Sequence, residues 1–77
     1  MKQNAQYIAG EIRAELARQG KAQRDLAEHF DVSLMWVSAR LAGKVEFKVS
    51  QLMQVAAYLG VPVTQFLPRT EPARRAS

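Results

Sequence analysis

Few side chains in this 77-residue sequence could carry out catalysis or hold a metal. The chain has no cysteine, and His29 is its single histidine, which excludes thiolate chemistry and a histidine-pair metal site. The carboxylates are scattered over expected helix surfaces and form no catalytic pair. We therefore predict that the protein is not an enzyme and has no catalytic residues, metal or cofactor. His29 is expected to be a solvated helix residue, with a weak phosphate contact as the alternative.

The remaining chemistry is that of binding a polyanion. The net charge is +4 and the isoelectric point is about 10.0, which favours nucleic acid or an anionic membrane surface. A membrane-binding helix would have one broad apolar face, whereas the apolar faces here are narrow and divided among several short segments. No segment approaches the roughly 18 apolar residues that span a bilayer, and no signal peptide is evident. We expect a soluble intracellular protein with no membrane partner and no small-molecule ligand.

The elements that must position the binding residues are predicted to be short helices. Ile8, Ile12 and Leu16 recur every four positions, and together with Ala9 and Ala17 they predict an amphipathic helix over residues 5–19. The other predicted helices cover residues 22–30, 34–42, 49–59 and 62–67, with glycines 20, 43 and 60 at three of the ends. The sequence predicts an all-α, compact five-helix domain over residues 1–67 and a disordered basic tail over residues 68–77.

Helical periodicity also predicts the core. Glu15 falls outside the apolar stripe of the first helix, and we expect Val45 and Phe47 to turn inward from the loop before residue 49. The predicted core residues of the other helices are Leu26, Ala27, Phe30, Val37, Leu41, Leu52, Val55, Ala56, Leu59, Val63, Phe66 and Leu67.

The second and third predicted helices are joined by a short turn, an arrangement typical of a helix-turn-helix. Ser33 is a good N-cap for the third helix. Asp31 falls in the turn, where a left-handed conformation would cost free energy that glycine avoids. Ala22 is a poor N-cap, which predicts unpaired amides at the start of the second helix.

The third helix has one side that points away from the predicted core. At about 100° per residue, Val37 and Leu41 point inward and Leu34 lies near their side. The residues predicted to point outward or to flank that side are Met35, Ala39, Ala42, Trp36, Ser38 and Arg40.

The motif QxxLAxxxxVS…V…LxGK, followed by LxxVAxxLGVPxxxFL, resembles the Cro/repressor-like (XRE) helix-turn-helix family. The phrases WVSxRLxGK and LGVPVTQFL are closest in look to actinobacterial and actinobacteriophage repressor and Cro-type proteins. The resemblance covers residues 8–67. It implies a lambda-repressor-like fold in which the third helix lies in the DNA major groove and the second lies across the DNA backbone.

The resemblance also implies roles for individual residues. Gln23 matches a residue that contacts a phosphate or supports a base-reading side chain, Ser33 matches the N-cap of the recognition helix, and Lys44 matches a basic residue that meets phosphate. The positions that commonly face base edges are occupied by Leu34, Met35, Ser38 and Ala39.

Leu34, Met35 and Ala39 differ from the Gln, Arg or Asn found at such positions. They can pack on a thymine methyl group but cannot bond a guanine edge. Hydrogen-bonded readout then falls to Ser38 and Arg40, with the Trp36 indole nitrogen as an alternative.

Several binding roles stay open at this stage. We place Arg40 with the base-facing residues; the alternatives are a phosphate contact or a surface ion pair with Asp31 or Glu28. Trp36 is predicted to contact the DNA backbone, with partial burial against the second helix as the alternative. Lys48 is predicted to contact the DNA backbone as well.

These observations predict a sequence-specific double-stranded DNA-binding transcriptional regulator, a phage Cro-like protein or repressor that occupies operator DNA through residues 34–42, in the cytoplasm of a bacterial host cell. The alternative is an antitoxin-like interaction module with secondary DNA binding. A homodimer through Val63 or Phe66 of the last helix and a monomer that dimerises on DNA both remain open. So does the tail, whose arginines 69, 74 and 75 are either solvated or a basic arm on DNA.

Overall fold

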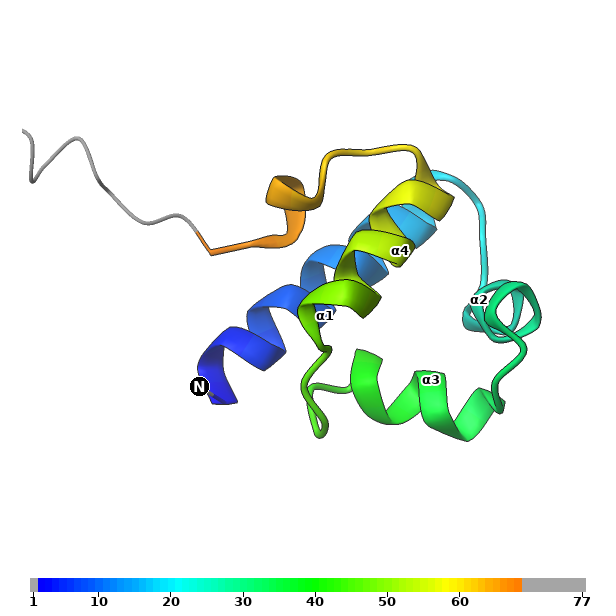
Figure 1. Cartoon of the computed structure of the whole chain (residues 1–77), viewed down its shortest axis with the longest axis horizontal. Helices are drawn as coiled ribbons and strands as arrows, with labels where there is room; N and C mark the ends of the chain where they lie inside the picture. The colour runs from blue at the N-terminus through cyan, green and yellow to red at the C-terminus, as the bar shows by residue number, and fades with distance from the viewer. Residues whose placement is uncertain (1, 69–77) are drawn as a thin grey trace, which may run out of the picture.

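The computed structural model of the chain describes residues 2–68, which contain helices and no strand. The elements are α1 (Lys2–Arg18), α2 (Gln23–Phe30), α3 (Leu34–Leu41), α4 (Val49–Leu59) and the 3₁₀ helix η1 (Val63–Phe66) (Figure 1). The predicted all-α class is confirmed, although the last of the five predicted helices is a single 3₁₀ turn. Residues 69–77 of the predicted tail, with its three arginines, lie outside the described residues.

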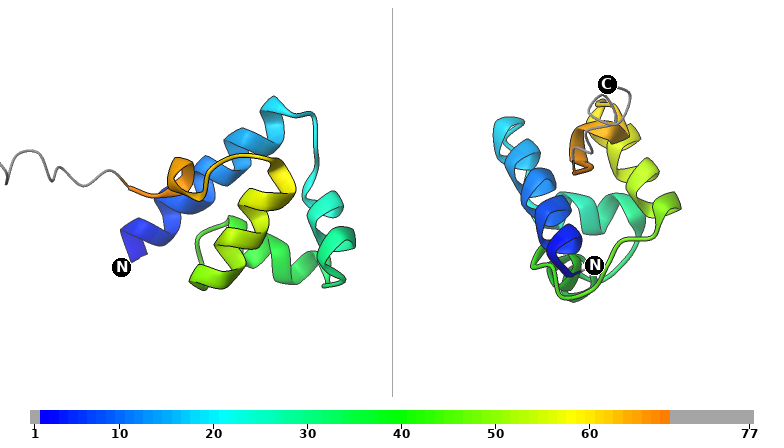
Figure 2. Two further views of the ribbon diagram at one scale, coloured as in Figure 1. Left: turned by 45° about the horizontal axis from the view of Figure 1, so that its top comes forward. Right: turned by 90° about the vertical axis from the view of Figure 1, so that its left-hand side faces the viewer.

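The helices enclose a single core. α1 and α4 form two sides, with α2 and α3 between them at one end (Figure 2). η1 packs against both α1 and α4 at the other end, and α3 contacts both α1 and α2. The second helix of the predicted binding motif, α3, is therefore supported from behind by the first helix of the chain.

The core consists of apolar side chains from all five helices, and each of its members lies on a face that the sequence predicts to be buried. These residues are Ile12, Leu16, Leu26, Ala27, Val37, Leu41, Leu52, Val55, Ala56, Leu59 and Phe66. Ala17 was predicted to widen the stripe of α1 but is exposed, because it lies about 100° around the helix from Leu16 and away from Ile12. Val45 and Leu67 are also exposed, whereas Phe47 packs against the core.

At the starts of α2 and α4, the side chain of the residue before the helix does not cap the free backbone amides of the first turn. In each case the backbone amide of that preceding residue is instead bonded to a side chain within the first turn. The Ala22 amide donates to the Asp25 carboxylate at 2.7 Å. The Lys48 amide donates in the same way to Oε1 of Gln51 at 2.8 Å. A side chain at the third helical position that reaches back is one half of a capping box. The expectation of unpaired amides at the start of α2 was therefore wrong for Ala22 itself.

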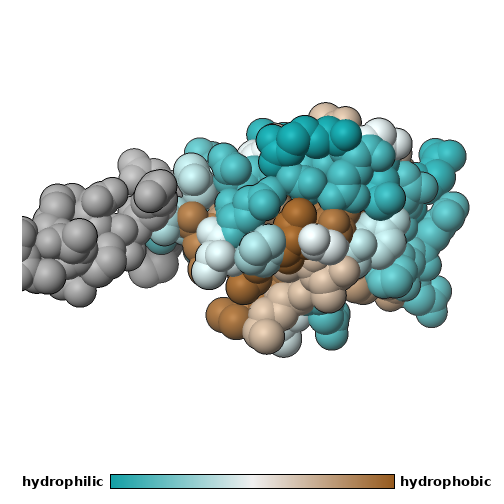
Figure 3. Space-filling view, turned by 90° about the horizontal axis from the view of Figure 1, so that it is seen from above, coloured by the Kyte–Doolittle hydropathy of each residue, from teal (hydrophilic) through white to brown (hydrophobic). Residues whose placement is uncertain are grey.

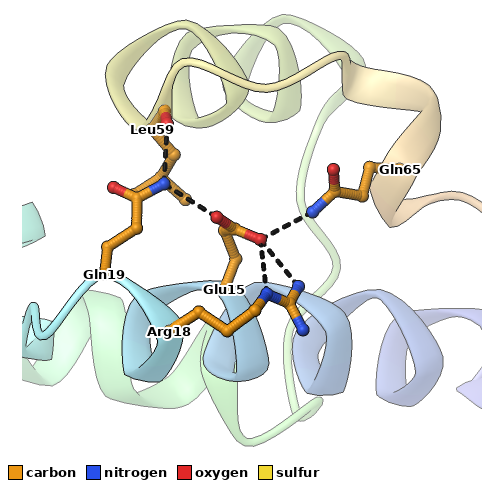
Figure 4. Close-up of polar contacts among 5 residues, drawn as sticks. All are labelled: Glu15, Arg18, Gln19, Leu59 and Gln65. Carbon is orange, nitrogen blue, oxygen red and sulfur yellow. Dashed lines mark hydrogen bonds and ion pairs between the residues drawn. The ribbon is translucent and has the colours of Figure 1, made fainter.

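Glu15 is a buried charged residue at the centre of a polar network (Figure 4). Its carboxylate accepts hydrogen bonds from Nε and Nη2 of Arg18 at 2.9 and 2.6 Å, and from the side-chain amides of Gln19 and Gln65 at 2.8 and 2.7 Å. The Gln19 amide also donates to the carbonyl oxygen of Leu59 at 2.8 Å. One carboxylate on α1 thus connects the end of α4 to η1, a role that its position outside the apolar stripe did not predict.

The burial of Phe66 corrects the predicted dimer contact. Its side chain has no exposed surface and packs into the core of its own chain. It therefore has no surface to offer across a two-fold axis. Val63, the other predicted contact, is partly exposed at the edge of the core.

Replacement of Leu26 by alanine should lower the free energy of unfolding by about 2–5 kcal/mol, since its side chain is 2% exposed and its loss leaves a cavity. Leu34→Ala is a matched control, because Leu34 is 43% exposed. Urea unfolding followed by circular dichroism measures both. Equal losses for the two variants would contradict the assignment of Leu26 to the core.

The Glu15 network should make stability depend on pH. Hydrogen bonds from Gln19 and Arg18 hold the pKa of Glu15 below its ordinary value of 4.5. Because the folded state lowers this pKa, the carboxylate stabilises the fold above pH 4.5, and that contribution is lost as the pH falls through the lowered pKa. We expect Glu15→Gln to lower the thermal midpoint at neutral pH, and its midpoint to approach that of the wild type in acid.

The control for this experiment is Glu28→Gln, which alters an exposed carboxylate on α2. That variant should keep the pH dependence of the wild type. The role of Glu15 would be refuted if the thermal midpoints of Glu15→Gln and the wild type differed by the same amount at neutral pH and in acid.

Candidate nucleic-acid interface

The turn between α2 and α3 has a geometry fixed by local interactions. Asp31 adopts the left-handed conformation, with φ of 58°, at the end of α2. The Val32 amide then donates to the carbonyl of Ala27 at 3.0 Å. Ser33 caps α3, as predicted, because its hydroxyl accepts a hydrogen bond from the Trp36 amide at 2.9 Å. The direction in which α3 leaves the turn is therefore set within a few residues.

α3 buries one narrow edge, and the residues on the rest of its surface are exposed or partly covered. Val37 and Leu41 are 2% and 1% exposed and form the buried edge. Met35 is 80% exposed on the outer side, and Leu34 is 43% exposed although periodicity placed it near the buried edge. Ser38 is exposed, and Ala39 is partly covered. The outer side of α3 is thus mostly apolar and accessible.

Gln23 and Ser38 connect the two helices of the motif on the outer surface. The hydroxyl of Ser38 donates to Oε1 of Gln23 at 2.9 Å. Gln23 is the first residue of α2, and the two side chains line a shallow hollow between the helices together with Leu34. The geometry supports the role in which Gln23 orients a side chain of α3.

Trp36 and Arg40 form a stacked pair on the flank of α3. The guanidinium carbon of Arg40 lies 3.7 Å from the centroid of the Trp36 ring, well within cation–π range. The Nε atom of Arg40 is buried without a hydrogen-bond partner, and no ion pair joins Arg40 to Asp31 or Glu28. Trp36 is half-buried and packs against the core. The pair therefore orients the Arg40 side chain along the indole ring.

The predicted cationic residues lie beyond the end of α3. Lys44 lies three residues after Leu41, the last residue of α3, and Lys48 directly precedes α4; both lysines are exposed. A second shallow hollow on the outer surface brings together four predicted site residues. These are Met35, Ser38, Ala39 and Lys44, joined in the lining by Ala42.

Two contacts from α1 hold the end of α3, and neither was predicted. A guanidinium nitrogen of Arg13 donates to the carbonyl oxygen of Leu41. Gly43 lies so close to α1 that a Cβ atom there would stand 2.7 Å from Cγ of Gln6. Arg13 carries no sequence signal for this role, because its partner is 28 residues away.

The described residues offer little other chemistry. His29 is exposed; its ring lies at a tilt to that of Tyr58 and edge-to-face with that of Phe30, with centroid distances of 4.2 and 4.7 Å. Between residues 2 and 68, no group of three or more acidic or histidine side chains could hold a metal ion. Within the same range, none of the helices has the length and apolar character needed to cross a bilayer.

The structure has the parts of a helix-turn-helix domain. These are a short α2, a turn through a left-handed residue, and an α3 whose outer side is accessible. The domain has the further property that α1 supports the outermost helix from behind. Its sequence then identifies the family. The chain belongs to the BetR domain family, whose sequence model matches residues 3–74.

Solved structures share this fold. The DNA-binding domain of BldD aligns with a TM-score of 0.78 at 24% identity, over 88% of this chain and 99% of that chain. The S. venezulae BldD DNA-binding domain gives 0.75 at 25% identity, over 86% and 99%. A hypothetical transcription factor NHTF from Neisseria gives 0.77 at 23% identity, over 100% and 90%. A comparison with curated proteins gives no match.

The contact between Gly43 and α1 can be tested with two glycines. Gly43 and Gly20 both have positive φ, 79° and 67°, so alanine should cost roughly 1 kcal/mol or more at either position. Only at Gly43 would the new Cβ meet Gln6, since nothing lies within 4 Å of that point at Gly20. We therefore expect Gly43→Ala to lower the thermal midpoint more than Gly20→Ala does. Equal losses would mean that α1 adjusts freely to the end of α3.

Proposed function

We propose that this protein is a sequence-specific double-stranded DNA-binding transcriptional regulator that inserts α3 into the major groove. The observation that carries the proposal is the accessible outer side of α3, on a helix whose inner edge is fixed in the core. An α-helix fits the width of the major groove of B-DNA, about 12 Å. The fold shared with two structures of a BldD DNA-binding domain and with a hypothetical transcription factor supports the same conclusion.

The charges around α3 support binding to the DNA backbone. Lys44 and Lys48 are exposed beyond its C-terminal end, and Arg24 is exposed in the first turn of α2. Contacts of this kind release counterions from DNA and contribute affinity that does not depend on base sequence. A net charge of +4 favours the same partner.

We assign the side chains of the interface according to their positions. Gln23 and Ser33, at the starts of α2 and α3, are assigned to phosphate contacts together with the two lysines. The base-facing residues are Leu34, Met35, Ser38 and Ala39. The stack on Trp36 directs Arg40 along the flank of α3, which favours a phosphate over a guanine edge for this side chain.

The proposed mode of regulation is repression of the Cro or phage-repressor kind. A domain that occupies operator DNA would exclude RNA polymerase from an overlapping promoter. The motif resemblance to actinobacterial and actinobacteriophage repressors supports this part of the proposal. A dimer on a palindromic operator would have to use residues other than Phe66, which is fully buried.

Selection of bound duplexes from a random pool tests the proposed function. We expect an enriched motif: a palindrome indicates a dimer, and an asymmetric motif indicates a monomer. If no sequence is enriched, sequence-specific binding is wrong. Purification of the protein with a bound partner protein would then favour the interaction-module alternative.

Lys44→Ala should weaken binding to the recovered duplex and to a shuffled duplex by the same factor. It should also reduce the slope of log affinity against log salt by roughly 0.9 for one lost phosphate contact. Arg18→Gln also removes one positive charge, at the end of α1 where Arg18 pairs with Glu15 beside η1 and away from α3, and should leave both quantities nearly unchanged. Fluorescence anisotropy across a salt series measures them. A loss confined to one sequence would contradict a phosphate contact by Lys44.

A further inference from the structure

The outer side of α3 is poor in hydrogen-bonding groups that are free to contact a base. The hydroxyl of Ser38 donates to Gln23, and this contact occupies Oε1 of that glutamine. Arg40 is stacked on Trp36. The other side chains of this surface are apolar: Leu34, Met35, Ala39 and Ala42.

The scarcity of free hydrogen-bonding groups on α3 disfavours the usual contacts to purine edges. Guanine is recognised by an arginine or lysine that bonds O6 and N7 together, and adenine by a glutamine or asparagine that bonds N6 and N7. Arg40 is turned to the flank, and the hydrogen bond from Ser38 holds the Gln23 side chain in an orientation set by α3. The apolar group that the major groove displays is the C5-methyl of thymine, which matches an apolar helix surface.

On the basis of the proposed DNA-binding function, we propose that α3 recognises its operator through apolar contacts to C5-methyl groups of pyrimidines in the major groove. Met35 is the principal contact, because its side chain is 80% exposed on the outer side. Its unbranched thioether can adapt to the position of a methyl group. Leu34 and the small Ala39 and Ala42 complete the surface. Because 5-methylcytosine carries the same methyl group, a methylated cytosine should replace thymine at a contacted step.

The lysines beside this surface match the same occupant. Lys44 lines the hollow that contains Met35, so a cation lies next to the apolar contact. The major groove offers methyl groups flanked by phosphates, and so it matches both the apolar side chains of α3 and the cation beside them. On the opposite face of the molecule hydrophilic side chains predominate, and apolar ones gather in the middle and along the lower edge (Figure 3).

The test uses the full chain and the duplex recovered from the random pool. Each thymine is replaced singly by deoxyuridine, which removes only the methyl group, and the dissociation constant is measured at fixed salt. We expect a roughly fourfold loss at each contacted thymine, the effect of exposing one methyl-sized group. Replacement of a contacted thymine–adenine pair by cytosine–guanine should weaken binding, and methylation of that cytosine should restore most of the loss.

Variants of two exposed methionines assign the effect to α3. Met35→Ala should bind the thymine duplex and the deoxyuridine duplex with nearly equal affinity, whereas Met35→Leu should retain the difference. Met53→Ala is the matched control, since Met53 is 57% exposed on α4 and should leave the methyl dependence unchanged. An unchanged thermal midpoint for Met35→Ala would exclude a folding defect.

The outcomes separate this inference from the proposed function. Equal affinity for the recovered and shuffled duplexes overturns sequence-specific binding and the inference with it. Preference for the recovered duplex with no deoxyuridine effect at any position overturns the inference alone. A deoxyuridine effect that persists in full in Met35→Ala overturns the assignment of the contact to Met35.

Discussion

The position of α3 depends on the burial of two side chains, Val37 and Leu41, in the core that all five helices share. A helix of eight residues is too short to be stable alone in water, so its structure must come from tertiary packing. The buried edge is narrow, which leaves the opposite surface accessible. Arg13 and the close approach of Gly43 to Gln6 then fix the end of α3 against α1. Rigidity and accessibility of α3 are thus two results of the same packing.

The opposite end of the domain is closed by a polar interaction rather than by a long apolar contact. η1 is a single 3₁₀ turn, and it contributes one large buried side chain, Phe66. The Glu15 carboxylate receives the Gln65 amide from η1 and, through Gln19, is connected to the last residue of α4 (Figure 4). A buried carboxylate is tolerated because its oxygens are satisfied by several donors. The network thus adds polar contacts to a short segment whose one fully buried apolar side chain is Phe66.

Local rules predicted most of the fold. Glycines at 20, 43 and 60 and the Ser33 cap fall at helix ends as expected, and the period of 3.6 residues identified every member of the core cluster. The errors concern contacts between distant parts of the chain. Glu15 lies outside an apolar stripe, and only the arrival of Gln65, 50 residues later, explains its burial. The sequence predicted Phe66 both for the core and as an open dimer contact, and only the complete burial of its side chain decides between the two. The sequence likewise placed Arg40 on the binding surface but could not show its stack on Trp36.

The proposed DNA-binding mode separates affinity from discrimination. In this proposed mode, the exposed lysines beyond α3 supply an attraction to phosphate that is strong at low salt and the same for every sequence. An apolar surface on α3 contributes small increments, because each methyl contact buries little area and makes no hydrogen bond. Such a surface gains discrimination from the number of contacts and from the shape of the groove rather than from one bidentate pair. For that reason the rigid support of α3 matters: several weak contacts act together only if a fixed helix presents them at fixed spacing.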